Sequence, residues 1–427
     1  MKRVSTAILI ALAVTAGPSP ARVVGTATSA APVTADRIAA LPATEQTQWR
    51  AYLARSQALM AADKAALAAE QRQAGGAIRP DRPHGGGDGM PLDRDDSYYR
   101  SAEARAIADN IVSFQTPAGG WGKNQNRAGP PRARGEGWAI VERLPTYAAG
   151  DIQAADDRWA YVGTIDNGAT TTELRFLGRV QAQHPGRGGD AYRAAFLKGL
   201  RYLLTAQYPN GGWPQVYPLQ GGYHDAITYN DNALVEVTRL LAEVGAVGAS
   251  HAFVPVGLAA EARIAADKAV SVLLRSQVVV NGRRTVWAQQ HDALTLAPVG
   301  ARAFEPIALS TAESAGILRF LMEQPKPSPE MIAAVESGIA WLRSHGLRDV
   351  EWSRSDARLV SKPGAGPIWA RLYDVRTFKP VFGDRDRKVY DDVGEISTER
   401  RRGYSWFNTA PAAAIARFQK WKPGAAR

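Results

Sequence analysis

Four clusters of polar side chains stand out as places where chemistry could occur. They lie at residues 164–170 (TIDNGAT), 229–232 (YNDN), 302–306 (RAFEP) and 382–386 (FGDRD). Asp166 and Asp231 each stand just before a predicted helix, where a carboxylate often accepts hydrogen bonds from the first amides. We also interpret them as equivalent positions in successive repeats, so we expect them to converge. Two converging carboxylates among polar neighbours suit a hard cation such as calcium.

The third and fourth clusters each contain an arginine. Arg302 is followed by Glu305, so a salt bridge is the ordinary interpretation, and Arg385 lies in a charged stretch that would suit an exposed turn. His224 and His291 fall in loops, where polar packing is a commoner role than catalysis. The chain has no Ser-His-Asp order, no glycine-rich phosphate loop and no zinc motif.

The clusters recur at one place in a repeated unit, in which a helical pattern leads to a Gly-Gly-Trp turn, a polar loop and a second helical pattern. The turns are residues 115–121 (QTPAGGW) and 207–213 (QYPNGGW), with a weaker one around Trp287. The predicted helix pairs are 101–115 with 168–181, 191–207 with 232–244, 258–277 with 311–323, and a fourth candidate, 330–345 with 409–420. This predicts an all-α fold, an incomplete α/α toroid of helical hairpins with long inter-helix loops and short strands. The loops would gather at one rim.

The segments before the repeats have other compositions. Lys2 and Arg3 precede an apolar run at residues 8–14 and then small residues, which predicts a signal peptide over residues 1–30 with an unresolved cleavage site. Residues 36–74 are alanine-rich and predict a helix pair or one long helix. Residues 75–97 are rich in glycine, proline and charge and are interpreted as a linker. The toroid would then be a catalytic domain over residues 98–421.

The amino-acid composition limits the kinds of site and of binding partner that the chain can have. The 427-residue chain has no cysteine, which excludes thiol catalysis and cysteine metal sites, and its formal net charge is +11. An exported basic protein meets polyanions outside the cell, such as acidic polysaccharide, rather than nucleic acid. We therefore expect a secreted or periplasmic protein, with no membrane attachment after signal cleavage, that acts as a monomer.

The motifs, taken in order, carry a resemblance to a known family. Besides the four clusters they include residues 207–215 (QYPNGGWPQ), 228–233 (TYNDNA) and 399–404 (ERRRGY). Together they resemble the tenth family of polysaccharide lyases, pectate lyases, from about residue 98 to residue 421. Several motifs in the right order make this resemblance specific, whereas any one alone would be weak.

The resemblance implies the toroid, calcium, and cleavage of polygalacturonate by β-elimination to unsaturated oligogalacturonides. Arg302 would be the proton-abstracting arginine, and Asp166 and Asp231 would match the family's calcium or substrate-cleft aspartates. Arg385 would pair with a uronate carboxylate, although Arg371 and Arg387 are alternatives. The expected substrate-binding set is completed by Lys123, Asn124, Tyr229 and His291.

That chemistry needs positive charge. β-Elimination removes the C5 proton beside the uronate carboxylate and expels the O4-linked sugar, so cations against that carboxylate stabilise the transition state more than the ground state. A free guanidinium has a pKa above about 12, so the role of Arg302 as base rests on the resemblance. A protonated Arg302 could instead bind substrate while hydroxide or water takes the proton.

Three rival functions fit parts of the sequence. The turns match the Q-x-x-x-G-x-W repeat of triterpene cyclases, and residues 93–96 (DRDD) match their acid motif, but that tetrad ends a glycine-rich segment and not an apolar one. A toroid glycoside hydrolase would use Asp166 and Asp231 as acid and base. A non-catalytic protein that binds acidic polysaccharide would use the tryptophans as sugar platforms.

Overall fold

The computed structural model describes residues 22–78, 80, 90–139 and 159–422. The α-helices are α1 Ala35–Ala39, α2 Ala43–Gln73, α3 Asp96–Arg100, α4 Ala102–Ser113, α5 Thr171–Gln183, α6 Asp190–Ala206, α7 Ala233–Gly245, α8 Val256–Ser276, α9 Thr311–Leu321, α10 Pro329–Ser344, α11 Thr398–Gly403 and α12 Ala410–Lys420. The strands are β1 Val23–Thr26, β2 Gly163–Thr164, β3 Val216–Tyr217, β4 Ile227–Thr228, β5 Val279–Val280, β6 Arg283–Arg284, β7 Gln290–His291, β8 Pro298–Val299, β9 Ala308–Ser310, β10 Val350–Ser353, β11 Arg358–Ser361, β12 Trp369–Ala370, β13 Leu372–Asp374, β14 Phe382–Gly383, β15 Lys388–Tyr390 and β16 Phe407–Asn408. They form small antiparallel sheets of two or three strands between the helices.

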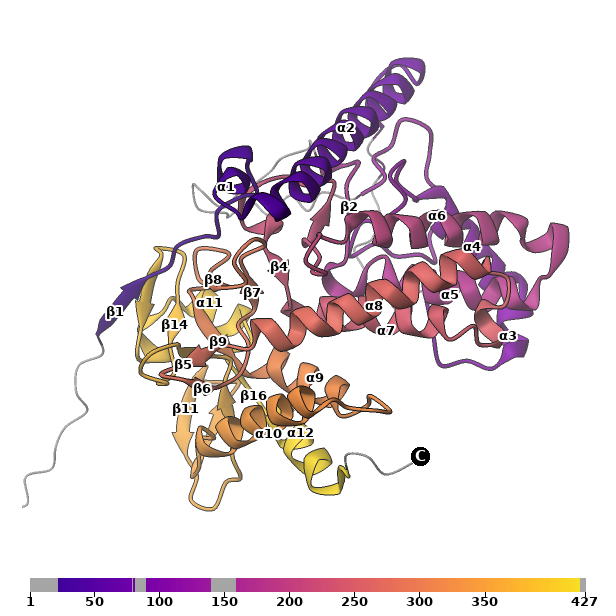
Figure 1. Cartoon of the computed structure of the whole chain (residues 1–427). Helices are drawn as coiled ribbons and strands as arrows, with labels where there is room; N and C mark the ends of the chain where they lie inside the picture. The colour runs from indigo at the N-terminus through magenta and orange to yellow at the C-terminus, as the bar shows by residue number, and fades with distance from the viewer. Residues whose placement is uncertain (1–21, 79, 81–89, 140–158, 423–427) are drawn as a thin grey trace, which may run out of the picture.

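The long helices lie in two rows (Figure 1). One row holds the first helices, in the contact order α4, α6, α8 and α10, and the other holds the second helices, α5, α7, α9 and α12. The predicted helices are therefore confirmed, but the main contacts between the rows join α5 to α6, α7 to α8 and α9 to α10, so a second helix packs chiefly against the first helix of the next predicted pair. The curvature of an incomplete toroid stays a prediction.

A buried tryptophan after each first helix repeats the same contact. Its indole Nε1 donates to a carbonyl near the end of that helix: Trp121 to Ile111, Trp213 to Leu203, Trp287 to Leu273 and Trp369 to Leu342, at 2.7–2.8 Å. These bonds satisfy carbonyls that a helix end leaves without partners. The tryptophans predicted from the turns therefore lie in the core and are not exposed sugar platforms.

The glycines of the turns allow adjacent hairpins to pack closely. Gly119 and Gly211 have φ of +114° and +102°, in the range that favours glycine. A Cβ on Gly119 would lie 2.7 Å from the Lys198 carbonyl oxygen, and one on Gly211 would lie 2.6 Å from that of Lys268. Each turn thus rests directly on the first helix of the next hairpin.

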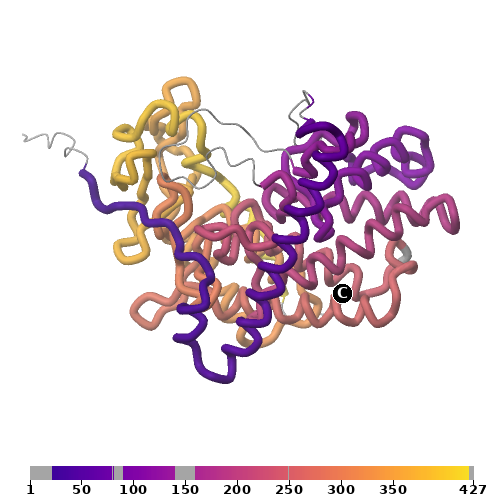
Figure 2. Tube along the Cα trace, turned by 90° about the horizontal axis from the view of Figure 1, so that it is seen from above, coloured from indigo at the N-terminus to yellow at the C-terminus, as the bar shows by residue number. Residues whose placement is uncertain are grey.

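The N-terminal helical segment crosses the rest of the chain in the view from above (Figure 2), and two hydrogen bonds join α2 to the first turn and to the end of α6. In α2, the Tyr52 hydroxyl donates to the Ala206 carbonyl at 2.8 Å, and Asp63 accepts from the Ala118 amide at 3.2 Å. Residues 36–74, for which the sequence predicts a helix pair or one long helix, hold the short α1 and the long α2. The segment shares the main hydrophobic core with the hairpins instead of forming a separate unit.

The first described residues overlap the predicted signal peptide, residues 1–30. Residues 1–21 and, within the predicted linker, residues 79 and 81–89 lie outside the described residues. Strand β1 pairs antiparallel with β15, and the Ala30 amide donates to the Gly300 carbonyl at 2.9 Å. Residues 23–30, the last part of the predicted signal peptide, therefore contact the folded chain. Among the described residues, no helix has the length and apolar character needed to cross a membrane.

Candidate active site

Two short 3-10 turns, η3 (Asp166–Gly168) and η6 (Asn230–Asn232), lie just before the second helices α5 and α7 and contact each other. Asn167 and Asp231 share one left-handed conformation, with φ of 52° and 51°. Asp231 is therefore equivalent to Asn167, and Asp166 to Asn230. The interpretation that the two aspartates hold equivalent places is wrong by one residue. They nevertheless converge, because the turns themselves are neighbours, and neither caps its helix, since no side-chain cap is present on α5 or α7.

Asp166 is buried in an ion pair. Lys123 Nζ lies 2.6 Å from its Oδ2, and the Asp166 side chain is 5% exposed. Burial alone would raise the pKa of Asp166, but the Lys123 charge, with a smaller contribution from Arg302, outweighs it and lowers that pKa. Asp166 is therefore a carboxylate at neutral pH.

Asp231 is the more accessible carboxylate, with 43% of its side chain exposed. Arg371 Nη2 lies 3.9 Å from its Oδ1. Partial burial and then the charge of Asp166 raise the pKa of Asp231 to about 6. Arg371 is fixed by buried Glu313, 2.7 Å away, and its guanidinium lies 4.7 Å from the centre of the Tyr404 ring. The Arg371 guanidinium therefore lies beside an aspartate that can gain or lose a proton.

Arg302 is held by Glu305 in a two-point ion pair. Its Nε and Nη2 donate to Glu305 Oε2 and Oε1 at 2.8 and 2.6 Å. Burial alone would lower the pKa of Arg302, but the Glu305 carboxylate outweighs it and raises that pKa well above its usual value. Because Glu305 is 3% exposed, this pair is not the surface salt bridge that the sequence suggested. Arg302 Nη1 makes no hydrogen bond to any residue that the structure describes.

Three arginine side chains pack around the Phe304 ring. The guanidinium carbons of Arg302, Arg400 and Arg385 lie 4.6, 4.5 and 5.7 Å from its centre. Glu399 binds both Arg385, at 3.1 Å, and Arg400. The hydrogen bond from Arg400 is the main reason that the pKa of Glu399 falls to about 2. Arg385 is thus near Arg302 but is already paired with a carboxylate of the chain.

Two predicted substrate-binding residues are corrected by their burial. Tyr229 is 1% exposed, and its hydroxyl lies 2.6 Å from Ser276 Oγ. His291 is fully buried, accepts from the Ala288 amide at 3.1 Å, and has a pKa lowered to about 4 by burial. Both residues hold the loops together and cannot touch a substrate in this structure. Asn124 instead lies beside Lys123 at the surface, where its Oδ1 accepts from Asn167 at 3.0 Å.

The site offers oxygen ligands for a cation, but too few to enclose one. Asp166 Oδ1 is buried without a hydrogen bond to the described residues, and Asp231 faces the same region. Hard oxygen donors of this kind fit calcium, which takes six to eight of them. In the part of the chain that the structure describes, no three acidic or histidine side chains converge on one point. The residues therefore fit a calcium ion whose remaining ligands come from substrate or water.

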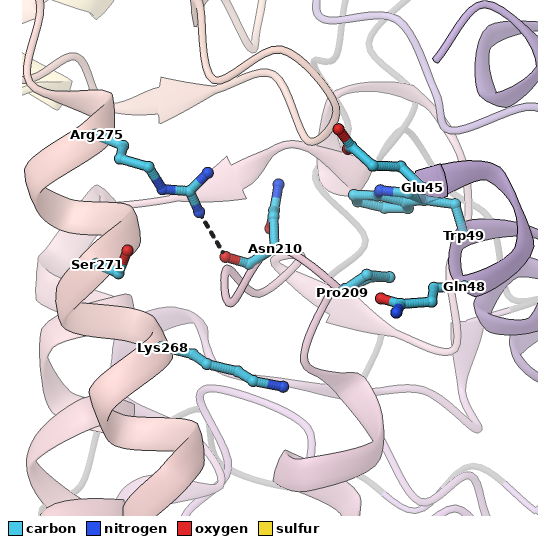
Figure 3. Close-up of a pocket in the computed structure, with 8 residues that line it drawn as sticks. All are labelled: Glu45, Gln48, Trp49, Pro209, Asn210, Lys268, Ser271 and Arg275. Carbon is cyan, nitrogen blue, oxygen red and sulfur yellow. Dashed lines mark hydrogen bonds between the residues drawn. The ribbon is translucent and has the colours of Figure 1, made fainter. Parts of the chain in front are cut away.

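A separate cavity of about 380 Å³ lies between α2 and α8 (Figure 3). Arg275 donates to the Asn210 carbonyl at 2.8 Å across it, with Lys268 on the same helix and Glu45 on the opposite wall. None of the predicted site residues lines this cavity.

The sequence interpretation missed one positional signal. Lys123 and Arg371 each stand two residues after a repeat tryptophan, and Gln289 holds the same place after Trp287. All three reach the cluster: Lys123 binds Asp166, Arg371 approaches Asp231, and Gln289 lies 3.1 Å from both Asn230 and Tyr404. The second residue after each of these three tryptophans is therefore a site position. Glu313 and Tyr404 had no comparable signal.

The acid motif expected of a triterpene cyclase has a structural role. Asp95 accepts from the amides of Ser97 and Tyr98 at the start of α3, and the hydrogen bond from the Ser97 hydroxyl is the main cause of its lowered pKa. An exposed, ionised cap cannot serve as a protonated acid.

Comparisons with known proteins agree with the resemblance drawn from the motifs. The sequence pattern of the pectic acid lyase family matches residues 115–415. A mutant of the family 10 polysaccharide lyase from Cellvibrio cellulosa, in complex with trigalacturonic acid, is 33% identical, with a TM-score of 0.65 over 78% of this chain and 98% of its own. A second structure of that lyase has the same identity and TM-score and covers 78% and 97%. No curated protein matches the sequence. The chain belongs to the pectic acid lyase family and is a polysaccharide lyase.

Proposed function

We propose that the enzyme is a pectate lyase that cleaves α-1,4-linked polygalacturonate by calcium-assisted β-elimination to unsaturated oligogalacturonides. The observation that carries this proposal is the half-exposed Asp231 between a second carboxylate, Asp166, and the cations Arg371 and Arg302. An anionic sugar needs such cations, and a calcium ion needs such carboxylates. The trigalacturonic acid bound to the Cellvibrio lyase supports the same substrate class.

Asp231 and Asp166 are the proposed protein ligands of calcium. When bound, calcium would supply positive charge against the uronate carboxylate and so stabilise the charge that builds there as the C5 proton leaves. Lys123 neutralises Asp166 and limits the repulsion between the two aspartates. Asn124, the neighbour of Lys123, could donate a hydrogen bond to a sugar hydroxyl.

Arg302 is the proposed base at C5. Its Nη1 is the guanidinium nitrogen without a partner among the described residues, while Glu305 fixes the other two nitrogens. For this role Arg302 must first lose the proton that Glu305 stabilises, which requires added positive charge nearby or an alkaline medium. The rest of the Arg302 site then serves to orient Nη1.

Arg385 is the proposed partner of a neighbouring uronate carboxylate, with Arg371 as the second clamp. Since Glu399 already binds Arg385, substrate would have to replace Glu399 there. Glu399 is 54% exposed and so has room to leave. A planar guanidinium suits two-point contact with a carboxylate better than a lysine does.

The rival functions are less well supported. Membership in a lyase family disfavours a glycoside hydrolase, in which Asp166, ionised and paired with Lys123, would have to be the base and Asp231 the acid. Membership in a lyase family also disfavours a purely binding role. A secreted or periplasmic location and a monomeric state remain part of the proposal, with signal cleavage before Val23.

One assay tests the function. The protein is incubated with polygalacturonate, with and without EDTA, and the ultraviolet absorbance of the unsaturated uronide is followed. We expect absorbance to rise, to stop on chelation, and to resume with added calcium. New reducing ends without that absorbance would indicate hydrolysis and overturn the proposal.

A further inference from the structure

A second cavity, of about 510 Å³, lies beside the candidate active site. Its walls come from the end of α11 and from the turn between β10 and β11. It is lined by three arginines, Arg354, Arg401 and Arg402, and by aromatic side chains that include Trp352 and Tyr404. Among the described residues, no aspartate or glutamate lines it. The cavity therefore combines positive charge with apolar ring surface.

The three guanidinium groups have no acidic partner among the residues that the structure describes. Within the described part of the chain, none of them forms an ion pair, in contrast to Arg400, which binds Glu399. Arg401 and Arg402 donate only to neutral oxygens, of Thr398 at 3.1 Å and Ser355 at 3.3 Å. Arg401 Nε is buried without a hydrogen-bond partner. Arginines concentrated without carboxylates favour an anionic ligand, because each keeps donors available for two-point contacts.

Tyr404 connects this cavity to the active site. It lines the cavity, while its hydroxyl donates to Glu305 at 3.0 Å and its ring lies 4.7 Å from Arg371. A polymer held at Arg302 and Arg371 could thus pass Tyr404 and enter the cavity. The aromatic rings would meet the apolar faces of a sugar.

We propose that this cavity is a distal subsite that binds the carboxylate of a further uronate on the same polysaccharide chain. Arg401 and Arg402 bind the carboxylate, and Arg354 adds charge from the β10–β11 turn. The proposal rests on the proposed function, because the ligand is the substrate of the neighbouring site. It predicts that the enzyme favours long chains over short ones.

The test compares R401Q/R402Q with wild type on polygalacturonate and on trigalacturonic acid. The matched control is K268Q/R275Q, which also removes two positive charges, from the cavity of Figure 3. We expect R401Q/R402Q to raise KM for the polymer about tenfold or more, since charged hydrogen bonds are lost. The preference for polymer over trimer should fall by a similar factor, and the control should retain it.

Binding without turnover separates this proposal from the proposed function. Gel retardation by polygalacturonate in EDTA should weaken for R401Q/R402Q and not for the control, even if no lyase activity is found. Fully methyl-esterified pectin should retard wild type and variant equally. Equal KM changes on polymer and trimer, or unchanged retardation, would overturn the subsite. R354Q, at an exposed position, gives the same comparison if the double variant has a lowered Tm.

Discussion

The Arg302 guanidinium donates two hydrogen bonds of 2.8 and 2.6 Å to the Glu305 carboxylate, and the Tyr404 hydroxyl donates to the same Glu305 oxygen, Oε1, that accepts the shorter one. The Glu305 carboxylate is buried, so it cannot turn away to water. Arg302 is consequently well oriented but strongly protonated. Its orientation suits a base. Its raised pKa opposes that role unless added positive charge nearby lowers it.

The first prediction separates Arg302 as base from Arg302 as binder. If Arg302 removes the C5 proton, Arg302→Lys and Arg302→Ala should both lower kcat by about 10²–10⁴ or more. The affinity for an oligogalacturonate, measured without turnover, should change little. A near-normal kcat in Arg302→Lys, or a defect confined to binding, would make Arg302 a carboxylate clamp.

Glu305→Gln tests the pKa of Arg302. Removing the carboxylate should lower that pKa, so the neutral guanidine forms at lower pH and the alkaline rise of kcat should shift towards neutrality. Glu399→Gln is the matched control, since it removes a carboxylate from Arg385 and Arg400 instead. A pH profile that is unchanged in Glu305→Gln would show that the proton of Arg302 does not limit the rate.

The repeats explain how much could be predicted. Helix periodicity and the Gly-Gly-Trp turns located the helices, because those signals are local. Alignment of Asp166 with Asp231 failed by one residue, since only the left-handed backbone of Asn167 and Asp231 defines the true equivalence. Tyr229 is buried by contacts with residues distant in the chain, such as Ser276, whose Oγ lies 2.6 Å from its hydroxyl. No local pattern reports such packing.

Substrate charge gives another prediction. Because the proposed clamps are cations, binding to polygalacturonate should weaken as salt rises and as carboxylates are methyl-esterified. Highly esterified pectin should be a poor substrate, mainly through a higher KM. Initial rates on polymers of graded esterification, at two salt concentrations, check this. Equal rates on all of them would contradict the roles of Arg371 and Arg385.

Gly211→Ala should destabilise the fold by about 2–4 kcal/mol, because φ of +102° is strained for alanine and the new Cβ would clash with the Lys268 carbonyl. Gly282→Ala is the control: its φ of +75° is also positive, but a Cβ there would have no atom within 4 Å apart from its chain neighbours. Its cost should be about 1 kcal/mol. Urea unfolding measures both, and equal losses would mean that backbone strain alone, without the close contact, sets the stability of the turn.

Calcium binding should depend on pH through Asp231. Its pKa is raised to about 6 by burial and by Asp166, so the carboxylate that binds calcium is mostly lost at pH 5 and mostly present at pH 8. We expect affinity to fall up to about tenfold per pH unit below 6.

Calorimetric titration of calcium into Arg302→Ala with trigalacturonic acid measures this affinity without turnover. Asp231→Asn in the same background should bind calcium weakly at both pH values. A folded-state pKa above the unfolded value means that ionisation of Asp231 disfavours folding above pH 6. Without calcium, Asp231→Asn should therefore be at least as stable as wild type at pH 8. Calcium affinity that is equal at pH 5 and pH 8, or unaffected by Asp231→Asn, would remove Asp231 from the calcium site.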